Sequence, residues 1–134
     1  MLRKFLHGKI HHARVTECHE EYVGSITIDA ELLEATGIRP NEMVLIADME
    51  NGNRFETYVF RGEPGSAVIA VNGAAAKLTG EGHRLIIMAF GFLTNESIEG
   101  HEARVVVTDE KNRIAQRLTY PSTLDLPEMA SNSV

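Results

Sequence analysis

The chain has 134 residues, a length that fits one domain, and its 13 Lys and Arg against 19 Asp and Glu give a formal net charge of −6. Hydrophobic residues make up 43% and charged residues 24%, which is ordinary for a soluble globular protein. The acidic balance argues against a general nucleic-acid binder, and no apolar run approaches the length of a membrane span.

The cellular compartment is indicated by the cysteine count and by the first residues. Cys18 is the only cysteine, so the chain cannot form an internal disulfide. The first nine residues include basic ones but have no apolar stretch behind them, so we expect no signal peptide. A cytoplasmic location is therefore expected.

Most of the chain is predicted to form short strands separated by turns. Residues Ser25–Asp29 alternate polar and apolar side chains, as a half-buried strand does. Asn51-Gly52 lies between two apolar runs and is a strong hairpin signal, because both residues accept positive φ at low cost. The predicted strands are 25–29, 43–49, 54–60, 67–72, 83–92, 103–109 and 113–119.

One helix is predicted, over Ala30–Thr36. Asp29 can cap its first turn, and Gly37 can end it in the left-handed conformation. A short helical turn is also possible within 94–100. From Pro121 onwards the chain is rich in Pro and Ser and has no periodicity, so 121–134 is predicted to be a disordered tail. The sum is a single mainly β domain over 1–120, with regular short strands that favour a barrel over a sandwich.

The dipeptide Gly24-Ser25, at the mouth of a predicted strand, would by itself be an ordinary loop end. Its significance comes from the motifs around it, which agree in order and spacing. They are Lys9-Ile10-His11, Tyr22-Val23-Gly24-Ser25, Asn51-Gly52-Asn53-Arg54-Phe55-Glu56-Thr57-Tyr58, Gly65-Ser66 and Val71-Asn72-Gly73-Ala74-Ala75-Ala76. Together they resemble the pyruvoyl-dependent aspartate 1-decarboxylase family over about residues 1 to 119.

The resemblance implies a double-psi β-barrel that assembles as a homotetramer with active sites at subunit interfaces. It also implies that the precursor cuts itself between Gly24 and Ser25 into chains 1–24 and 25–134. Ser25 then becomes a covalent pyruvoyl group that forms a Schiff base with L-aspartate. Decarboxylation gives β-alanine for pantothenate and coenzyme A synthesis, with no metal or nucleotide cofactor. Spontaneous cleavage and cleavage assisted by a maturation factor are both compatible with the sequence.

The resemblance also assigns roles to individual residues. Tyr58 matches the family's proton donor, and a phenol with a reference pKa near 10 is protonated at neutral pH. Thr57 matches a residue used in self-cleavage and substrate binding, although it and Tyr58 point to opposite faces of a regular strand. The other matched residues are Lys9, Arg54, Gly73, Ala74 and Ala75 for substrate binding, and His11, Tyr22 and Asn72 near the pyruvoyl group.

Each of these side chains also has an ordinary structural explanation. Arg54 can pair its planar guanidinium with the substrate's surviving carboxylate, yet most arginines at hairpin ends are simply solvated. The run after Asn72 can bring backbone N–H groups close to a carboxylate, or can be a tight turn into a short helix. His7, His11, His12 and His19 do not have the spacing of a recognised metal site, and His12 is expected at the surface.

Two departures from the family pattern stand out. Residues 18–21 are more polar than is usual there, and His83 occupies a position where the family usually has an acidic residue. The alternative function is an uncleaved, non-catalytic β-barrel that binds a small acid or a protein. A swapped-hairpin transcription factor is disfavoured by the net charge of −6.

Overall fold

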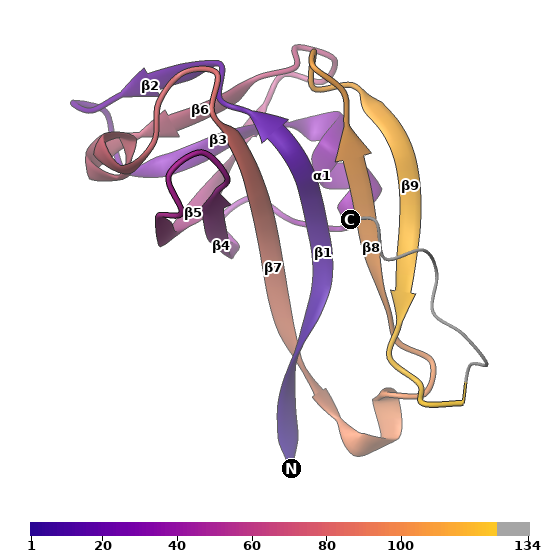
Figure 1. Cartoon of the computed structure of the whole chain (residues 1–134). Coiled ribbons are helices and arrows are strands. Elements are labelled where there is room, and N and C mark those ends of the chain that lie inside the picture. The colour runs from indigo at the N-terminus through magenta and orange to yellow at the C-terminus, as the bar shows by residue number, and fades with distance from the viewer. Residues whose placement is uncertain (126–134) are drawn as a thin grey trace.

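The structure is a computed structural model that describes residues 1–125. Its elements are labelled in Figure 1. In chain order they are β1 (Leu2–Arg14), β2 (Glu17–His19), β3 (Ser25–Asp29), α1 (Ala30–Thr36), β4 (Met43–Asp48), β5 (Arg54–Gly62), β6 (Ile69–Asn72), the 3-10 helix η1 (Gly73–Leu78), β7 (Arg84–Thr94), the 3-10 turn η2 (Asn95–Ser97), β8 (Glu102–Thr108) and β9 (Ile114–Pro121).

The strands form one mixed sheet in the order β2-β6-β3-β5-β4-β7-β1-β8-β9. Three neighbouring pairs are parallel, namely β1 with β8, β2 with β6, and β3 with β5, and the others are antiparallel. The sheet curls around one core, and β1 and β7 continue beyond it as a two-stranded arm that ends at the N-terminus (Figure 1). The prediction of a small, mainly β barrel is confirmed.

The inner face of the sheet carries the core. Ile10 pairs with Ile87, Ile87 with Ile46, and Ile46 with Phe55, so that one row crosses four strands. The three isoleucines are fully buried and Phe55 is 9% exposed. Because side chains alternate between faces, the residues before and after these ones lie on the outer face of the sheet. This alternation decides where the candidate site residues point.

Helix α1 forms as the sequence predicts. The Asp29 carboxylate accepts a hydrogen bond from the Glu31 N–H at 2.9 Å, and Gly37 ends the helix with φ 77°. Leu32 and Leu33 are buried on the side that packs toward β8 and β1. The same Asp29 carboxylate also accepts the N–H groups of Gly65 and Ala67, at 3.0 and 2.8 Å.

The observed strands differ from the predicted ones in two places. The 13-residue β1 is absent from the predicted strands, because bulges at 6–8 and 11–13, the second with His12 at φ 73°, break its alternation. Strand β6 begins at Ile69 and not at 67, because Ala67 has φ 65°.

The predicted tail lies partly outside the described residues. Strand β9 reaches Pro121, and the next residue, Ser122, shares a 2.8 Å hydrogen bond between its hydroxyl and His101 Nδ1. The part of the tail prediction that concerns 126–134 falls beyond the residues that the structure describes. No helix within residues 1–125 is long and apolar enough to cross a membrane.

Candidate active site

Ser25 lies at the start of β3 and is fully buried. Its hydroxyl donates to the Val23 carbonyl at 3.2 Å and accepts a hydrogen bond from Asn72 Nδ2 at 3.0 Å. The same Asn72 Nδ2 also donates a hydrogen bond to Thr27 Oγ1 at 3.2 Å. Thr27 lies two residues after Ser25 in β3. Ser25 and Asn72 are direct partners in the antiparallel β3–β6 ladder. The structure therefore joins two of the predicted site residues and holds the Ser25 hydroxyl in one orientation.

Gly73 provides the space for the segment that precedes Ser25. A Cβ atom on Gly73 would lie 2.5 Å from Gly24 Cα and 2.8 Å from Gly24 N, and Gly73 has φ 80°. A Cβ on Gly24, in contrast, would meet nothing within 4 Å, and Gly24 is not among the glycines with positive φ. Neither the space around Gly24 nor its φ therefore requires a glycine at this position. The requirement for glycine lies at Gly73.

Tyr22 forms part of a cavity beside the cleavage dipeptide. Its ring stacks on His19 with centroids 4.3 Å apart and planes 11° apart, and His19 is the register partner of Asn72 in the parallel β2–β6 pair. His19 has no predicted role, and its only local signal is the polar run 18–21, whose first two residues belong to β2. The cavity measures about 650 Å³ and is lined by Glu17, His19, Glu21, Tyr22, Val23, Thr27, Phe60, Val68, Ala70 and Asn72.

Tyr58 projects from β5, the parallel neighbour of β3. The parallel register pairs Ile26 with Val59. Ser25 and Tyr58 each come one residue earlier, so these two residues are also neighbours across the two strands. Tyr58 lies on the outer face, 38% exposed, in edge-to-face contact with Phe60. Thr57 points to the opposite face, as predicted for a regular strand, and pairs with buried Val44. The role of Thr57 in the site stays a prediction.

Lys9, His11 and Arg54 lie on the outer face of the sheet, away from Ser25. His11 is aligned with Arg54 through the pairs His11–Ile86, Ile86–Ala47 and Ala47–Arg54. Strands β7, β4 and β5 lie between β1 and β3 in the strand order, so Lys9 and His11 are not on a strand that neighbours the strand of Ser25. Arg54 is four residues from Tyr58 along β5, about 13 Å. Within residues 1–125, no hydrogen bond or register pair joins these three residues to Ser25.

His11 is a buried polar side chain with an unused atom. It is 8% exposed, and its Nδ1 has no hydrogen-bond partner among the described residues. Burial, followed by the charges of His12 and Lys9, lowers the pKa of His11 from its ordinary value near 6.5 to about 4. The ring is therefore neutral at physiological pH and offers a nitrogen that can bind a polar group. Burial also lowers the pKa of Lys9, whose Nζ lies 5.5 Å from the ring centroid of Tyr120.

The segment after Asn72 turns directly into the 3-10 helix η1, which confirms the predicted turn into a short helix. Gly73 and Ala76 are buried, whereas Ala74 is exposed and Ala75 is half-buried against the core. Ala74 is thus exposed to solvent two residues after Asn72. This arrangement suits the close approach of a small anionic ligand to backbone N–H groups.

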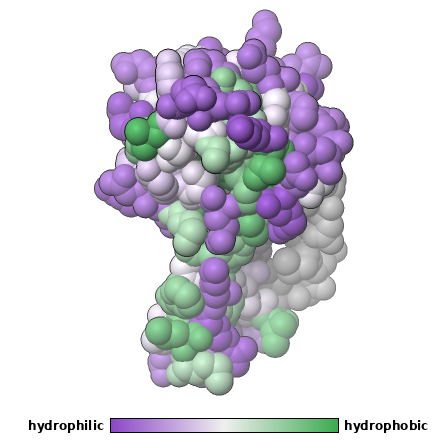
Figure 2. Space-filling model, turned by 90° about the vertical axis from the view of Figure 1, so that its left-hand side faces the viewer, coloured by the Kyte–Doolittle hydropathy of each residue, from purple (hydrophilic) through white to green (hydrophobic). Residues whose placement is uncertain are grey.

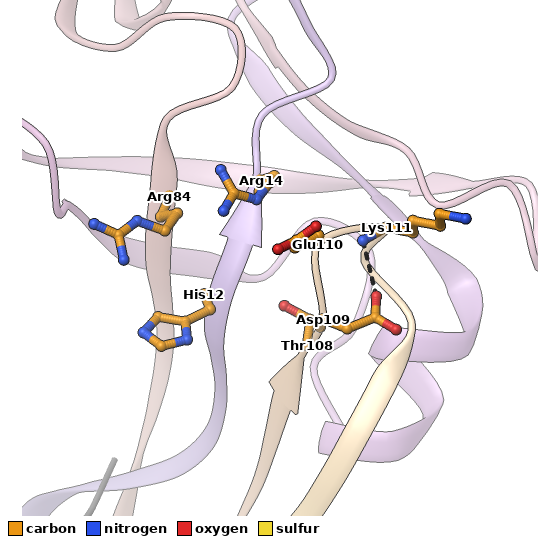
Figure 3. Close-up of a pocket in the computed structure, with 7 residues that line it drawn as sticks. All are labelled: His12, Arg14, Arg84, Thr108, Asp109, Glu110 and Lys111. Carbon is orange, nitrogen blue, oxygen red and sulfur yellow. Dashed lines mark hydrogen bonds between the residues drawn. The ribbon is translucent and has the colours of Figure 1, made fainter.

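A second cavity, of about 530 Å³, lies at the end of β1 (Figure 3). Its residues are His12, Arg14, Arg84, Thr108, Asp109, Glu110 and Lys111, none of which belongs to the predicted site. His12 is half-buried at the edge of this cavity, and its ring packs on His11 with centroids 4.0 Å apart. Within residues 1–125 no three His, Cys, Asp or Glu side chains are grouped to hold a metal ion.

Comparisons with known proteins agree with the motifs around this site. A family model described as aspartate decarboxylase matches residues 1–115. The aspartate 1-decarboxylase of Listeria welshimeri is 50% identical over 123 residues, which cover 92% of this chain and 97% of that protein. That of Listeria monocytogenes is 53% identical over 114 residues, covering 85% and 90%. That of Exiguobacterium sibiricum is 52% identical over 119 residues, covering 89% and 94%.

Proposed function

The chain belongs to the aspartate decarboxylase family, and on that premise we propose that it converts L-aspartate to β-alanine and CO2 with a pyruvoyl group made from its own Ser25. The observation that carries the proposal is the buried Ser25 hydroxyl, held by Asn72 beside Gly24. The β-alanine would feed pantothenate and coenzyme A synthesis in the cytoplasm, and this part of the proposal rests on family membership.

Self-cleavage uses groups of this chain alone. The Ser25 hydroxyl oxygen attacks the Gly24 carbonyl carbon, the Gly24–Ser25 C–N bond breaks, and the nitrogen takes up the hydroxyl proton. Loss of the Ser25 Cα proton then breaks the new ester at Cβ and releases residue 24 as a carboxylate. Water replaces the nitrogen of the remaining dehydroalanine, and ammonia leaves. The Asn72 hydrogen bond supports this path because it fixes the hydroxyl that must attack.

The residues around Ser25 fit the pyruvoyl group. Asn72 offers its side-chain amide, and the turn at Gly73 leaves room where any side chain would touch residue 24. When in place, the group supplies an electron sink for the loss of the α-carboxylate. Tyr58 stands beside Ser25 on the outer face and donates the proton that the carbon receives afterwards. The backbone of Ala74 and Ala75 helps to bind the substrate.

The remaining predicted site residues, two for substrate binding and His11 near the pyruvoyl group, come from a second copy of the chain. No hydrogen bond or register pair within residues 1–125 links Lys9, His11 and Arg54 to Ser25, and these three residues share an outer face that another subunit can present. The surface around Ser25 supports such a contact, because several large apolar side chains there are exposed. These are Tyr22 (62%), Val23 (68%), Met43 (59%), Tyr58 (38%) and Phe60 (39%). We propose a homotetramer in which Arg54 of one subunit pairs with the β-carboxylate of aspartate at another.

Mass spectrometry of the denatured protein tests the cofactor. The proposal predicts two fragments, 1–24 and 25–134, the larger without a free amino terminus, together with β-alanine formation from aspartate. Ser25→Ala should stay an intact, folded and inactive chain. An intact wild-type chain of 14.8 kDa without decarboxylase activity would instead support the non-catalytic binding module. Cleavage of the purified chain in isolation would show that no maturation factor is required.

A further inference from the structure

Asp48 joins two loops that are far apart in the sequence. Its carboxylate is buried and accepts hydrogen bonds from Thr79 Oγ1 at 2.7 Å and His83 Nδ1 at 2.8 Å, both on the connection from η1 to β7. Its other oxygen accepts the Glu50 N–H at 2.8 Å, at the start of the β4–β5 hairpin turn. One carboxylate thus fastens the hairpin turn to the η1–β7 connection.

Further contacts tie the same two loops together. The side-chain amides of Asn51 and Asn53 both donate to the Leu78 carbonyl, at 3.1 and 2.9 Å. Arg84 Nε donates to Glu50 Oε2 at 2.7 Å. These bonds lie at the surface, where each contributes little by itself, whereas Asp48 is the buried centre of the group. Loss of a donor to Asp48 therefore costs more than loss of one of the outer bonds.

Arg54 follows this hairpin turn directly. Its guanidinium has no hydrogen bond or ion pair within residues 1–125, so its position depends on the backbone that carries it. That backbone is fixed at Asn53, whose carbonyl accepts the Asp48 N–H at 2.8 Å. A shift of the turn would displace the Arg54 side chain without touching any group beside Ser25.

The charge of Asp48 suits this arrangement. Burial acts to raise the pKa of its carboxyl, but hydrogen bonds from Thr79, His83 and the Glu50 N–H outweigh burial, and the pKa is lowered. The facing charged groups are His83, whose side chain is 33% exposed, and the Arg84–Glu50 pair. The histidine that departs from the family pattern at 83 is thus the partner of a buried carboxylate.

We propose that Asp48, held by Thr79 and His83, is a positioning residue that sets the place of Arg54 for recognition of the substrate's surviving carboxylate. The inference rests on the proposed function, in which Arg54 binds aspartate. It assigns Asp48 no part in self-cleavage, since its carboxylate lies at the far end of β4 from Met43, the partner of Tyr58. The KM for aspartate should therefore respond to this group, and processing should not.

Two matched pairs of variants test the proposal. Thr79→Val keeps the shape and removes the hydroxyl, whereas Thr79→Ser keeps the donor. His83→Leu removes the ring donor, whereas His83→Asn keeps an N–H near the Nδ1 position. We expect Thr79→Val and His83→Leu to raise the KM for L-aspartate by about tenfold, with kcat within about twofold of wild type. The Ser and Asn variants should stay near wild type, and mass spectrometry should find complete self-cleavage in all four.

Succinate, a dicarboxylate without an amino group, tests whether the effect passes through Arg54. Calorimetry should find that Thr79→Val weakens succinate binding by about tenfold when Arg54 is present. In the Arg54→Ala background, the same change should weaken it no further. Additive losses, or a fall in kcat at constant KM, would overturn the positioning role alone. A cleaved or uncleaved wild type without aspartate turnover would overturn the proposed function and this inference with it.

Discussion

The two glycines at the cleavage site differ in what surrounds them. The backbone of Gly24 lies directly against Gly73, at the position that a Cβ atom would occupy. The corresponding position on Gly24 faces open space. The peptide that is cut is therefore shaped from outside, by a residue 49 positions later in the chain, and not by its own glycine. We therefore expect an added side chain to disturb the cleavage segment more at position 73 than at position 24.

Gly73→Ala should slow self-cleavage by at least about tenfold, because a methyl group 2.5 Å from Gly24 Cα must displace the segment that carries the attacked carbonyl. The measurement is the intact fraction over time by mass spectrometry. Gly65→Ala is the matched control, since Gly65 has the same φ of 80° but only a flexible Glu31 oxygen at 3.7 Å. It should lose stability, about 1 kcal/mol, but cleave normally. Equal cleavage of the two variants would contradict the explanation.

The free energy of unfolding should depend on pH through the lowered pKa of His11. Its pKa is about 4 in the folded chain and near 6.5 when unfolded, so the unfolded state binds more protons between these values. The wild type should therefore lose stability as the pH falls from about 6.5 toward 4. His11→Gln should lack this part of the acid dependence, and its stability difference from wild type should be constant above about pH 7. Urea unfolding at several pH values measures both, and parallel curves throughout would contradict the lowered pKa.

At the scale of elements, one carboxylate organises the start of α1. Asp29 is 1% exposed and accepts N–H groups from Glu31, Gly65 and Ala67, so it caps the helix and also fixes the loop before β6. The capping could be predicted from the sequence because it is local. The two loop contacts could not, because their partners are 36 and 38 residues away.

Asp29→Ala should lower the free energy of unfolding by about 2–4 kcal/mol, since it removes a helix cap and leaves two further N–H groups without their acceptor. Asp29→Asn is the conservative control, and it should lose less because one oxygen remains. Urea unfolding monitored by circular dichroism gives both values. A loss no larger than about 1 kcal/mol for the alanine variant would mean that water replaces the carboxylate at the loop.

Elsewhere in the chain too, local features could be predicted from the sequence, whereas interrupted patterns and contacts between distant residues could not. Helix α1 and the strands after residue 25 follow from local alternation and caps, whereas β1 escaped prediction because its two bulges interrupt the period. Motif order pointed to Ser25, Asn72 and Tyr58, which the structure brings together. His83 was noticed as unusual, but its partner Asp48 is 35 residues away and carries no local signal.

At the scale of the molecule, the apolar surface is unevenly distributed. Figure 2 shows apolar residues on the narrow arm below the barrel as well as on the barrel itself. Leu2 (63%) and Phe92 (66%) are exposed near the tip of that arm, where Leu2 pairs with Thr94 and Lys4 with Phe92, and another exposed group surrounds the cleavage site. Burial of such side chains between subunits would contribute roughly 25 cal/mol per Å². The proposed homotetramer has both surfaces available for contact.

A site shared between subunits predicts that two inactive variants restore each other. Ser25→Ala lacks the cofactor, and Lys9→Ala lacks a substrate-binding group, so each alone should be nearly inactive. In a mixed assembly, a site that takes Ser25 from the Lys9→Ala subunit and Lys9 from the Ser25→Ala subunit has both groups intact. Random assortment makes about a quarter of the sites of this kind.

Co-expression of the two variants with different affinity tags, followed by purification through both tags, isolates these mixed assemblies. Their β-alanine formation should approach about a quarter of the wild-type rate, whereas the separately purified variants mixed without subunit exchange should stay inactive. A doubly mutated chain co-expressed with wild type controls for the dilution of intact sites. Three strands separate the strand of Lys9 from the strand of Ser25 in the sheet order, and recovery would show that a site takes Lys9 from a neighbouring subunit. Mixed assemblies as inactive as either parent would mean that each subunit builds its site alone.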